Sequence, residues 1–268
     1  MKTLLEKIAI LLFKHNVRGR GLFSSTFNLH DIFFENSFGL KMRLDPSHYI
    51  EREIIINGFY EESVLNALQD ALSLTPSPVF WDIGANVGIH CLTLNLLQPD
   101  TECYAFEPYC KNFNKLYVNH QLNMSSVHLF NFGLSHDHEM NRIFTTLRNA
   151  GRTSFMDIQA IDKTSVNTLS CAGDFLVKQG LAQQPTVIKL DVEGWEMNVL
   201  RGCNKLLQNP KLHTIIFEGP TNPNDLEAID FLQQFGFHCT HMEREAHIIE
   251  SNENYIATRS PRLTKSSH

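Results

Sequence analysis

The sequence predicts an α/β fold built on a mostly parallel β-sheet that helices cover on both faces. Two observations carry this prediction. From residue 79 onward, short apolar runs alternate with stretches of helical periodicity, a pattern typical of strand–helix–strand units. Near the end of the chain, two apolar runs follow each other with no helix between them. We expect these two to pair as an antiparallel hairpin at one edge of the sheet.

The residues before position 79 form a separate N-terminal part in this interpretation. Leucine and isoleucine recur at helical spacing over residues 4–12, which predicts a first helix. Apolar and polar residues then roughly alternate over 32–44 around a central turn, which indicates a β-hairpin. A helix through 64–72 follows, and two prolines close it just before the main domain.

The main domain is expected to contain seven strands, each a short apolar run bounded by polar, glycine or proline residues. The strands are expected at 79–83, 103–107, 127–132, 187–191, 214–218, 237–242 and 255–258. Helices are expected at 89–97, from Pro108 onward, at 197–207 and from Asn222 to Gly236. The expected organisation is therefore an N-terminal helix, hairpin and linking helix over 1–78, a main domain over 79–260 and a polar tail over 261–268.

Composition limits the classes of function. The chain has 268 residues, 43% of them hydrophobic, which is enough for one sizeable core with a small appendage. Its formal net charge of −6 gives no electrostatic support for a nucleic-acid partner, so none is expected. The six cysteines form no CxxC pair, and we interpret them as reduced thiols of a cytoplasmic protein. No apolar run approaches the roughly 18 residues that span a bilayer.

The first helix is flanked by basic residues, namely Lys2, Lys14, Arg18 and Arg20. A basic amphipathic helix is typical of contact with a membrane surface. The alternative is a helix that docks on its own domain or on a second subunit, and a homodimer with twofold symmetry is then the default expectation. The sequence leaves these alternatives open.

The strongest local signal is the loop Asp82-Ile-Gly-Ala-Asn-Val-Gly88, which follows a strand and precedes a helix. Gly84 and Gly88 allow a tight turn and a close approach to a ligand at the carboxyl end of the sheet. The loop lacks the third glycine of a dinucleotide site. The carboxylate of Asp82 would repel a pyrophosphate but attract the ammonium or sulfonium group of S-adenosylmethionine. Glu107, which ends the second strand, is placed to bind both ribose hydroxyls.

A further acidic run, Lys189-Leu-Asp-Val-Glu-Gly-Trp-Glu196, ends the fourth strand, and Glu218 ends the fifth. The ends of adjacent parallel strands open a crevice in folds of this class. We therefore expect the carboxylates of this run and of Glu218 to face the reacting group.

Together these motifs resemble the FkbM family of S-adenosylmethionine-dependent methyltransferases. The resemblance covers most of the chain, and Lys-x-Asp-Val-Glu-Gly is its most specific piece. It is carried by Gly58-Phe-Tyr-Glu61, Asp82–Gly88, Phe106-Glu-Pro108, Val166-Asn-Thr-Leu169, Lys189–Glu196, Leu200-Arg-Gly202 and Asn254-Tyr-Ile256. The resemblance implies a Rossmann-like class I methyltransferase sheet of seven strands, S-adenosylmethionine as methyl donor, and O-methylation of a hydroxyl on a sugar or secondary metabolite.

The resemblance also implies roles for individual residues. Residues of the first loop would line the methionine part of the cofactor: Asp82, Gly84, Ala85, Asn86 and Gly88. Glu107, with Pro108 beside it, would hold the ribose, and Asp191 would lie near the methyl-bearing end. The segment after the third strand, which is Gly133, Leu134 and Ser135, would lie by the adenine.

A hydroxyl nucleophile must lose its proton, so a general base is expected near the crevice. The candidates are Glu193, Glu196, Glu218 and His90, of which Glu193 is preferred. The alternative for each is a structural role, such as capping a helix or binding Lys189. The carboxylates here also suit Mg²⁺, but no metal is expected. The run His136-Asp-His-Glu139 is interpreted as a solvated turn and not as a zinc site.

Two other classes of function stay open as alternatives. One is a nicotinamide-dependent oxidoreductase, against which the missing third glycine argues. The other is a non-catalytic module that keeps the fold and binds a partner, because fold alone never establishes activity. The acceptor, whether a small molecule or a glycan, is not specified by any motif.

Overall fold

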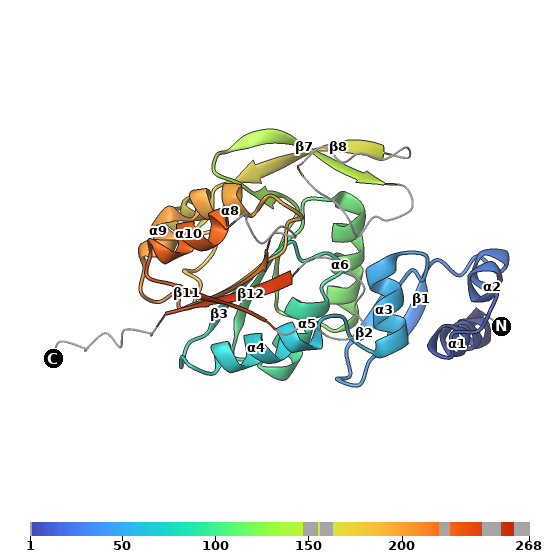
Figure 1. The fold of residues 1–268 in the computed structure, drawn as a ribbon. Helices are drawn as coiled ribbons and strands as arrows, with labels where there is room; N and C mark the ends of the chain where they lie inside the picture. Colours follow the sequence, from blue (N-terminus) through green and yellow to red (C-terminus); the bar gives the residue numbers. More distant parts are fainter. Residues whose placement is uncertain (1, 147–154, 156–162, 220–225, 243–252, 260–268) are drawn as a thin grey trace.

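The computed structural model describes residues 2–146, 155, 163–219, 226–242 and 253–259. Its centre is a seven-stranded sheet in the order β11-β12-β10-β9-β3-β4-β5 (Figure 1). The strands are β3 (Val79–Ile83), β4 (Glu102–Phe106), β5 (His128–Phe130), β9 (Val187–Leu190), β10 (Thr214–Gly219), β11 (His238–His241) and β12 (Glu253–Thr258).

The predicted sheet is confirmed. Strand β12 is antiparallel to both of its neighbours, β10 and β11, and the remaining pairs of neighbouring strands in this sheet are parallel. Strand β3 is buried along its whole length, as expected for a central strand of a parallel sheet. The chain runs outward from β3 to β4 and β5 and then returns to place β9 on the other side of β3. This reversal of direction opens a crevice at the carboxyl ends of β3 and β9.

Helices cover both faces of the sheet. One face packs against α4 (Glu62–Leu72), α5 (Ile89–Leu97) and α6 (Cys110–Leu122), and the other against α7 (Gly173–Lys178), α8 (Glu196–Gly202), α9 (Asn204–Gln208) and α10 (Glu227–Gln233) (Figure 1). Side chains of a strand alternate between these two cores. In β3, for example, Phe80 joins the first core and Trp81 the second.

The described N-terminal part contains three helices and a hairpin before α4: α1 (Lys2–Lys14), α2 (Arg20–Thr26), the hairpin of β1 (Ile32–Glu35) and β2 (Lys41–Leu44), and α3 (Tyr49–Asn57). The hairpin docks on α6, where the backbone N–H of Arg43 donates to Oδ1 of Asn119 at 2.7 Å. Helix α3 is held to α6 by an ion pair of 2.5 Å between Glu51 and Lys115. These contacts place α3 and its following turn beside the carboxyl end of the sheet. None of the described helices is both long and apolar enough to cross a membrane.

A second sheet was not predicted. It has three strands in the order β6-β8-β7, namely β6 (Gly133–Leu134), β7 (Glu139–Thr146) and β8 (Lys163–Cys171). The long antiparallel pair β7–β8 lies above the helices of the second face (Figure 1). The predicted turn is confirmed for His136 and Asp137, which form an exposed bend between β6 and β7 with Nε2 of His136 3.1 Å from Oδ2 of Asp137. Glu139, at the end of the same run, is the first residue of β7.

Two predicted helix boundaries are wrong. Pro108 does not start a helix, because α6 begins at Cys110 and the carbonyl of Pro108 accepts a hydrogen bond from Oγ1 of Thr168. The helix expected over 197–207 is divided into α8 and α9 at Cys203. The start of the helix expected at Asn222 and the polar tail over 261–268 lie outside the described residues.

Candidate functional site

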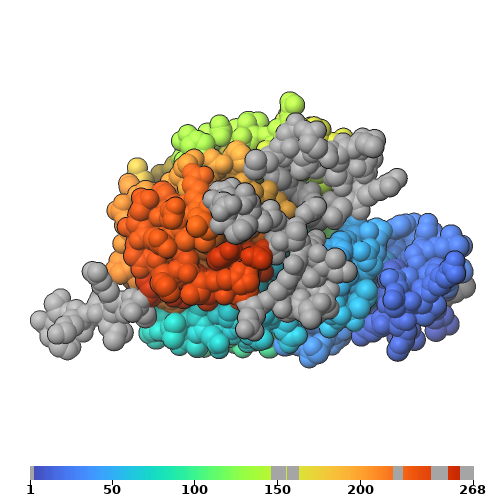
Figure 2. All heavy atoms as spheres, in the orientation of Figure 1, coloured from blue at the N-terminus to red at the C-terminus, as the bar shows by residue number. Residues whose placement is uncertain are grey.

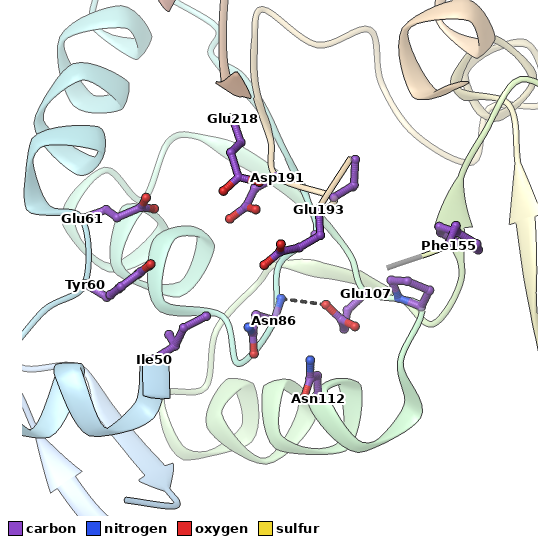
Figure 3. A pocket seen from close by; sticks show the side chains of 13 residues that line it. Ile50, Tyr60, Glu61, Asn86, Glu107, Asn112, Phe155, Asp191, Glu193 and Glu218 are labelled. Atoms are coloured by element: carbon purple, nitrogen blue, oxygen red, sulfur yellow. Dashed lines mark hydrogen bonds between the residues drawn. The ribbon is translucent and has the colours of Figure 1, made fainter. Parts of the chain in front are cut away.

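A cleft opens at the carboxyl ends of β3, β4, β9 and β10, where the crevice was expected (Figure 3). Three parts of the chain contribute most of its walls, namely the strand-end loops, the start of α6, and the N-terminal part around α3 and α4, and Phe155, between β7 and β8 in the sequence, adds to them. We call this site the acidic cleft. It is lined by Ile50, Tyr60, Glu61, Gly84, Asn86, Glu107, Pro108, Asn112, Phe155, Asp191, Val192, Glu193 and Glu218.

The loop after β3 forms the floor of the cleft. Gly84 has a φ of 87°, and its N–H donates to the carbonyl of Phe106 at 2.9 Å. A Cβ at this position would lie 1.8 Å from the carbonyl oxygen of Asp191, so only glycine fits. Gly88 has a φ of 90° and directly precedes α5, and a Cβ there would meet the side chain of Leu116 at 2.5 Å. Ala85 is buried in the same turn.

Glu107 joins the loop to the second strand. Its Oε2 accepts the backbone N–H of Asn86 at 2.9 Å, and its Oε1 accepts the backbone N–H of Tyr109 at 2.8 Å. The residue is almost fully buried, and this burial raises its pKa to about 7, against the opposing effect of the two backbone donors. The carboxylate is thus fixed in place with one lone pair on each oxygen still directed away from the backbone.

Asp82 lies beneath the cleft and not in its described lining. Its Oδ2 accepts the backbone N–H of Cys91 at 3.2 Å, while its Oδ1 has no hydrogen-bond partner in the described part of the chain. Burial raises the pKa of Asp82, and the nearby charge of Lys189 opposes this shift. Asp82 therefore lies beneath the described lining of the cleft, at the start of α5 and beside Lys189 in the neighbouring strand.

Lys189 is a buried cation between carboxylates. Its Nζ is 2.9 Å from Oδ2 of Asp191, which lies directly after β9 and lines the cleft. Burial alone would lower the pKa of Lys189, but the charges of Asp191, Asp82 and Glu61 raise it above its ordinary value. The lysine stays protonated, and its positive charge compensates the negative charges of the carboxylates around it.

The four candidate bases separate into two groups. Glu193 and Glu218 line the cleft, and Figure 3 shows both side chains directed into it beside Asp191. Glu193 has a φ of 52°, an unusual value outside glycine that the neighbouring loop must hold in place. Among the described residues, no group of three His, Cys, Asp or Glu side chains is arranged to hold a metal ion.

Glu196 and His90 occupy structural positions instead. Glu196 caps its own loop, since its Oε1 accepts the backbone N–H groups of Gly194 at 3.1 Å and Val192 at 3.4 Å. His90 is buried on α5 with its ring edge-on to Phe59 at 5.5 Å. Burial, and then the charge of Lys189, lower the pKa of His90 well below its ordinary value, so it is neutral at physiological pH.

The segment expected near an adenine contributes only indirectly. Leu134 and Ser135 are fully buried in the second core and against α8. Gly133 lies next to Phe155, because a Cβ on it would meet that ring at 2.5 Å. Phe155 and Pro108 are the residues that line the cleft here, and Phe155 packs on Trp195 with ring centroids 5.2 Å apart.

The N-terminal part supplies lining residues for which the sequence analysis predicted no individual role. Tyr60 and Glu61 come from the turn between α3 and α4, and Figure 3 shows both side chains reaching the cleft opposite Glu193. Glu61 has a φ of 58° and accepts a hydrogen bond of 2.8 Å from Nδ2 of Asn254 on β12. The available signal was the run Gly58–Glu61, which belongs to the resemblance although it precedes the main domain.

A sequence model described as the methyltransferase FkbM domain matches residues 82–239 of this chain. The curated relatives include the hexuronic acid methyltransferase AglP of Haloferax volcanii, which is 28% identical over 151 residues, 56% of this chain and 60% of AglP. The AMB antimetabolite synthetase AmbE of Pseudomonas aeruginosa is 30% identical over 104 residues, 39% of this chain. The chain thus spans 60% of the length of the first relative and 4% of the second.

Among solved structures, the METTL16 MTase domain superposes with a TM-score of 0.50 at 12% sequence identity. The superposition covers 83% of this chain and 74% of the METTL16 chain. At this identity the likeness concerns the fold, and it agrees with the seven-stranded sheet described above.

Proposed function

The chain belongs to the FkbM methyltransferase family, whose cofactor is S-adenosylmethionine, and from this premise we propose that it methylates a hydroxyl oxygen of a neutral sugar. One observation carries the proposal. Every charged side chain in the described lining of the acidic cleft is a carboxylate: Glu61, Glu107, Asp191, Glu193 and Glu218.

The acidic lining fits the cofactor. S-adenosylmethionine carries a sulfonium, an ammonium and a carboxylate, so its net charge is positive and the cleft attracts it. Glu107 is suited to the ribose, because each of its oxygens retains a lone pair for one hydroxyl after accepting a backbone N–H. The glycine at position 84 lets the loop after β3 pack directly against the backbone of Asp191, which brings these two parts of the cleft together.

We assign the remaining parts of the cofactor by chemistry. Phe155 and Pro108 offer an apolar wall beside Gly133, which suits the adenine ring. Asp191, held by Lys189, offers a fixed negative charge for the cationic end. When bound, S-adenosylmethionine supplies a methyl group on a positively charged sulfur, a reactive donor that needs an oxygen nucleophile in line.

The acceptor is inferred from the same charges. Carboxylates accept hydrogen bonds from hydroxyl groups, so the wall formed by Glu61, Glu193 and Glu218 suits a hydroxyl-rich molecule. The name of the relative AglP points to a sugar acid as the substrate of that protein. An anionic sugar would be repelled by the described lining here, which favours a neutral sugar for this chain.

Removal of the hydroxyl proton falls to a carboxylate of the cleft. Glu193 is the preferred base in this proposal, because it lines the cleft and its side chain points into it beside Asp191. Glu218 and Glu61 flank it and orient the acceptor in this proposal. Positioned proton transfer of this type contributes roughly 10²–10⁴-fold to a rate.

The nicotinamide-dependent alternative is disfavoured by the same lining, since a pyrophosphate would meet carboxylates and no cation in the described wall of the cleft. A non-catalytic module would retain cofactor binding without transfer. Only a measurement of methyl transfer separates that alternative from the enzyme.

The test is transfer from ¹³C-methyl S-adenosylmethionine to neutral hexosides and to the matching uronic acids, followed by mass spectrometry. We expect methyl ethers of neutral sugars. The variant Glu193→Gln should keep its affinity for the cofactor and slow transfer by roughly 10²–10⁴-fold. Glu62→Gln, an exposed neighbour of the cleft on α4, serves as control and should change neither quantity. Methylation of uronic acids alone would refute the neutral acceptor, and no transfer to any hydroxyl would refute the proposed function.

A further inference from the structure

Helix α1 is apolar on two opposite faces. One face is buried, with Ala9 and Phe13 packed on neighbouring elements of the N-terminal part, so the helix docks on its own chain. The other face carries Leu4, Ile8 and Leu11, which recur at helical spacing. We call these three residues the apolar stripe. A helix that only needed to dock would be polar on its second face.

The apolar stripe is open to solvent. The side chains of Leu4 and Leu11 are 63% and 55% exposed. Leu22 and Phe27, on and just after α2, are 74% and 46% exposed. Figures 1 and 2 show α1 and α2 together at one end of the molecule, beyond the hairpin and away from the main sheet. A concentration of exposed large apolar side chains in so short a segment marks an interaction surface.

The charge of this segment is opposite to that of the rest of the chain. Residues 1–27 contain five Lys and Arg and a single acidic residue, a net charge of +4, whereas residues 28–268 contain 18 basic and 28 acidic residues, a net charge of −10. The one acidic residue, Glu6, is buried and 3.5 Å from Arg43. Lys7 and Lys14 follow Leu4 and Leu11 by three positions and are exposed beside the stripe.

We propose that α1 and α2 dock on an anionic lipid bilayer, with the apolar stripe among the acyl chains and the basic residues at the headgroups. Helices with an apolar face and flanking cations lie in the membrane interface in this way. Each cation near an anionic surface adds roughly fivefold to binding. The acidic main domain would be held away from the same surface by its own charge.

A second copy of this chain fits the surface less well. A twofold interface would bring the same patch of each copy together, so the basic residues that flank the stripe would face one another. The stripe is also narrow, and the positive charge around it is complementary to phosphate headgroups and not to itself.

The experiment is flotation of the full chain with vesicles of phosphatidylcholine alone and of phosphatidylcholine with phosphatidylglycerol. We expect binding to the anionic vesicles that weakens from 50 to 500 mM salt, because exposed charges are screened. Leu4→Ser with Leu11→Ser should abolish flotation. Lys7→Gln with Arg18→Gln should weaken it about thirtyfold, at roughly fivefold per cation removed.

Matched controls come from the main domain. Met124→Ser with Leu181→Ser removes two side chains that are 92% and 54% exposed, and Lys178→Gln with Lys211→Gln removes two exposed cations. Both controls should float like the unmodified chain. The proposal fails if the unmodified chain does not bind anionic vesicles at low salt. It also fails if the control variants lose as much vesicle binding as the N-terminal variants do. It also fails if light scattering shows a dimer that only the Leu4 and Leu11 changes dissolve, without vesicle binding.

Discussion

The replacement Glu107→Gln should weaken cofactor binding and should remove the loss of stability that the unmodified chain shows as the pH rises from 5 to 8. Glu107 is almost fully buried, and its pKa of about 7 means that holding the charged carboxylate in the fold is unfavourable. In the unfolded chain the same group titrates near 4.5. Between these two values the folded state binds more protons than the unfolded state. The stabilising effect of the protonated group is therefore complete below pH 4.5 and is lost as the pH rises through 7.

The magnitude follows from the linkage between pKa and folding. A pKa that rises from 4.5 to about 7 lowers the free energy of unfolding by about 2–3 kcal/mol between pH 5 and pH 8, at roughly 1.4 kcal/mol per unit. Glutamine does not titrate, so the variant escapes this loss. Its amide has one acceptor oxygen, however, and can serve only one of the N–H groups of Asn86 and Tyr109, which costs about 1–2 kcal/mol at every pH.

Urea unfolding at pH 5 and pH 8, followed by tryptophan fluorescence, measures both effects. We expect the variant to be less stable than the unmodified chain at pH 5 and equal or more stable at pH 8. The difference in free energy of unfolding between the variant and the unmodified chain should change by about 2–3 kcal/mol from pH 5 to pH 8. Calorimetric titration at pH 8 should show that the variant has lost most of its affinity for S-adenosylmethionine. If the stability difference between the variant and the unmodified chain is the same at both pH values, the pKa of Glu107 is not raised by burial and the reasoning is refuted.

Two further changes test the floor of the cleft. Gly84→Ala places a Cβ 1.8 Å from the carbonyl of Asp191 at a φ of 87°, and it should lower the melting temperature far more than Gly180→Ala, which has a φ of 69° but open space around it. Equal effects of the two alanines would show that only the backbone angle matters. Lys189→Met removes the cation between Asp82 and Asp191, and it should lower the free energy of unfolding at pH 8 by about 3–5 kcal/mol. A loss below 1 kcal/mol in urea unfolding would contradict the role of Lys189 as the compensating charge.

The central sheet was predictable because its strands are continuous apolar runs between clear turn signals. Strand β3 is buried at every position, and its run Val-Phe-Trp-Asp-Ile is short, rich in β-branched and aromatic residues, and bounded by Pro78 and Gly84, which together favour a strand. Strand β8 carries a weaker signal, since its two buried residues, Thr168 and Ser170, are polar and the apolar Leu169 between them is exposed. Helix α3 contains three consecutive isoleucines, Ile54–Ile56, and a short apolar run of that kind does not distinguish a helix from a strand.

In the candidate site, too, some features could be predicted from the sequence and others could not. Residues at strand ends, such as Glu107 and Asp191, were predictable because the carboxyl ends of parallel strands meet at one edge of the sheet. Whether a carboxylate faces the cleft or the core was not predictable, because it depends on the side-chain direction and on neighbours far along the chain. Asp82 accepts the backbone N–H of Cys91 at the start of α5, and Glu196 accepts N–H groups of its own loop. Glu61 reaches the cleft only because α3 and α4 dock beside the sheet.

The most direct test of the acidic cleft as a methyl-donor site is isothermal titration of the full chain with S-adenosylmethionine and, separately, with NADH. We expect one molecule of S-adenosylmethionine to bind at micromolar strength and NADH not to bind, because the described carboxylates attract a cation and repel a pyrophosphate. Binding of NADH without binding of S-adenosylmethionine, in folded protein, would contradict the proposed cofactor and with it the reaction.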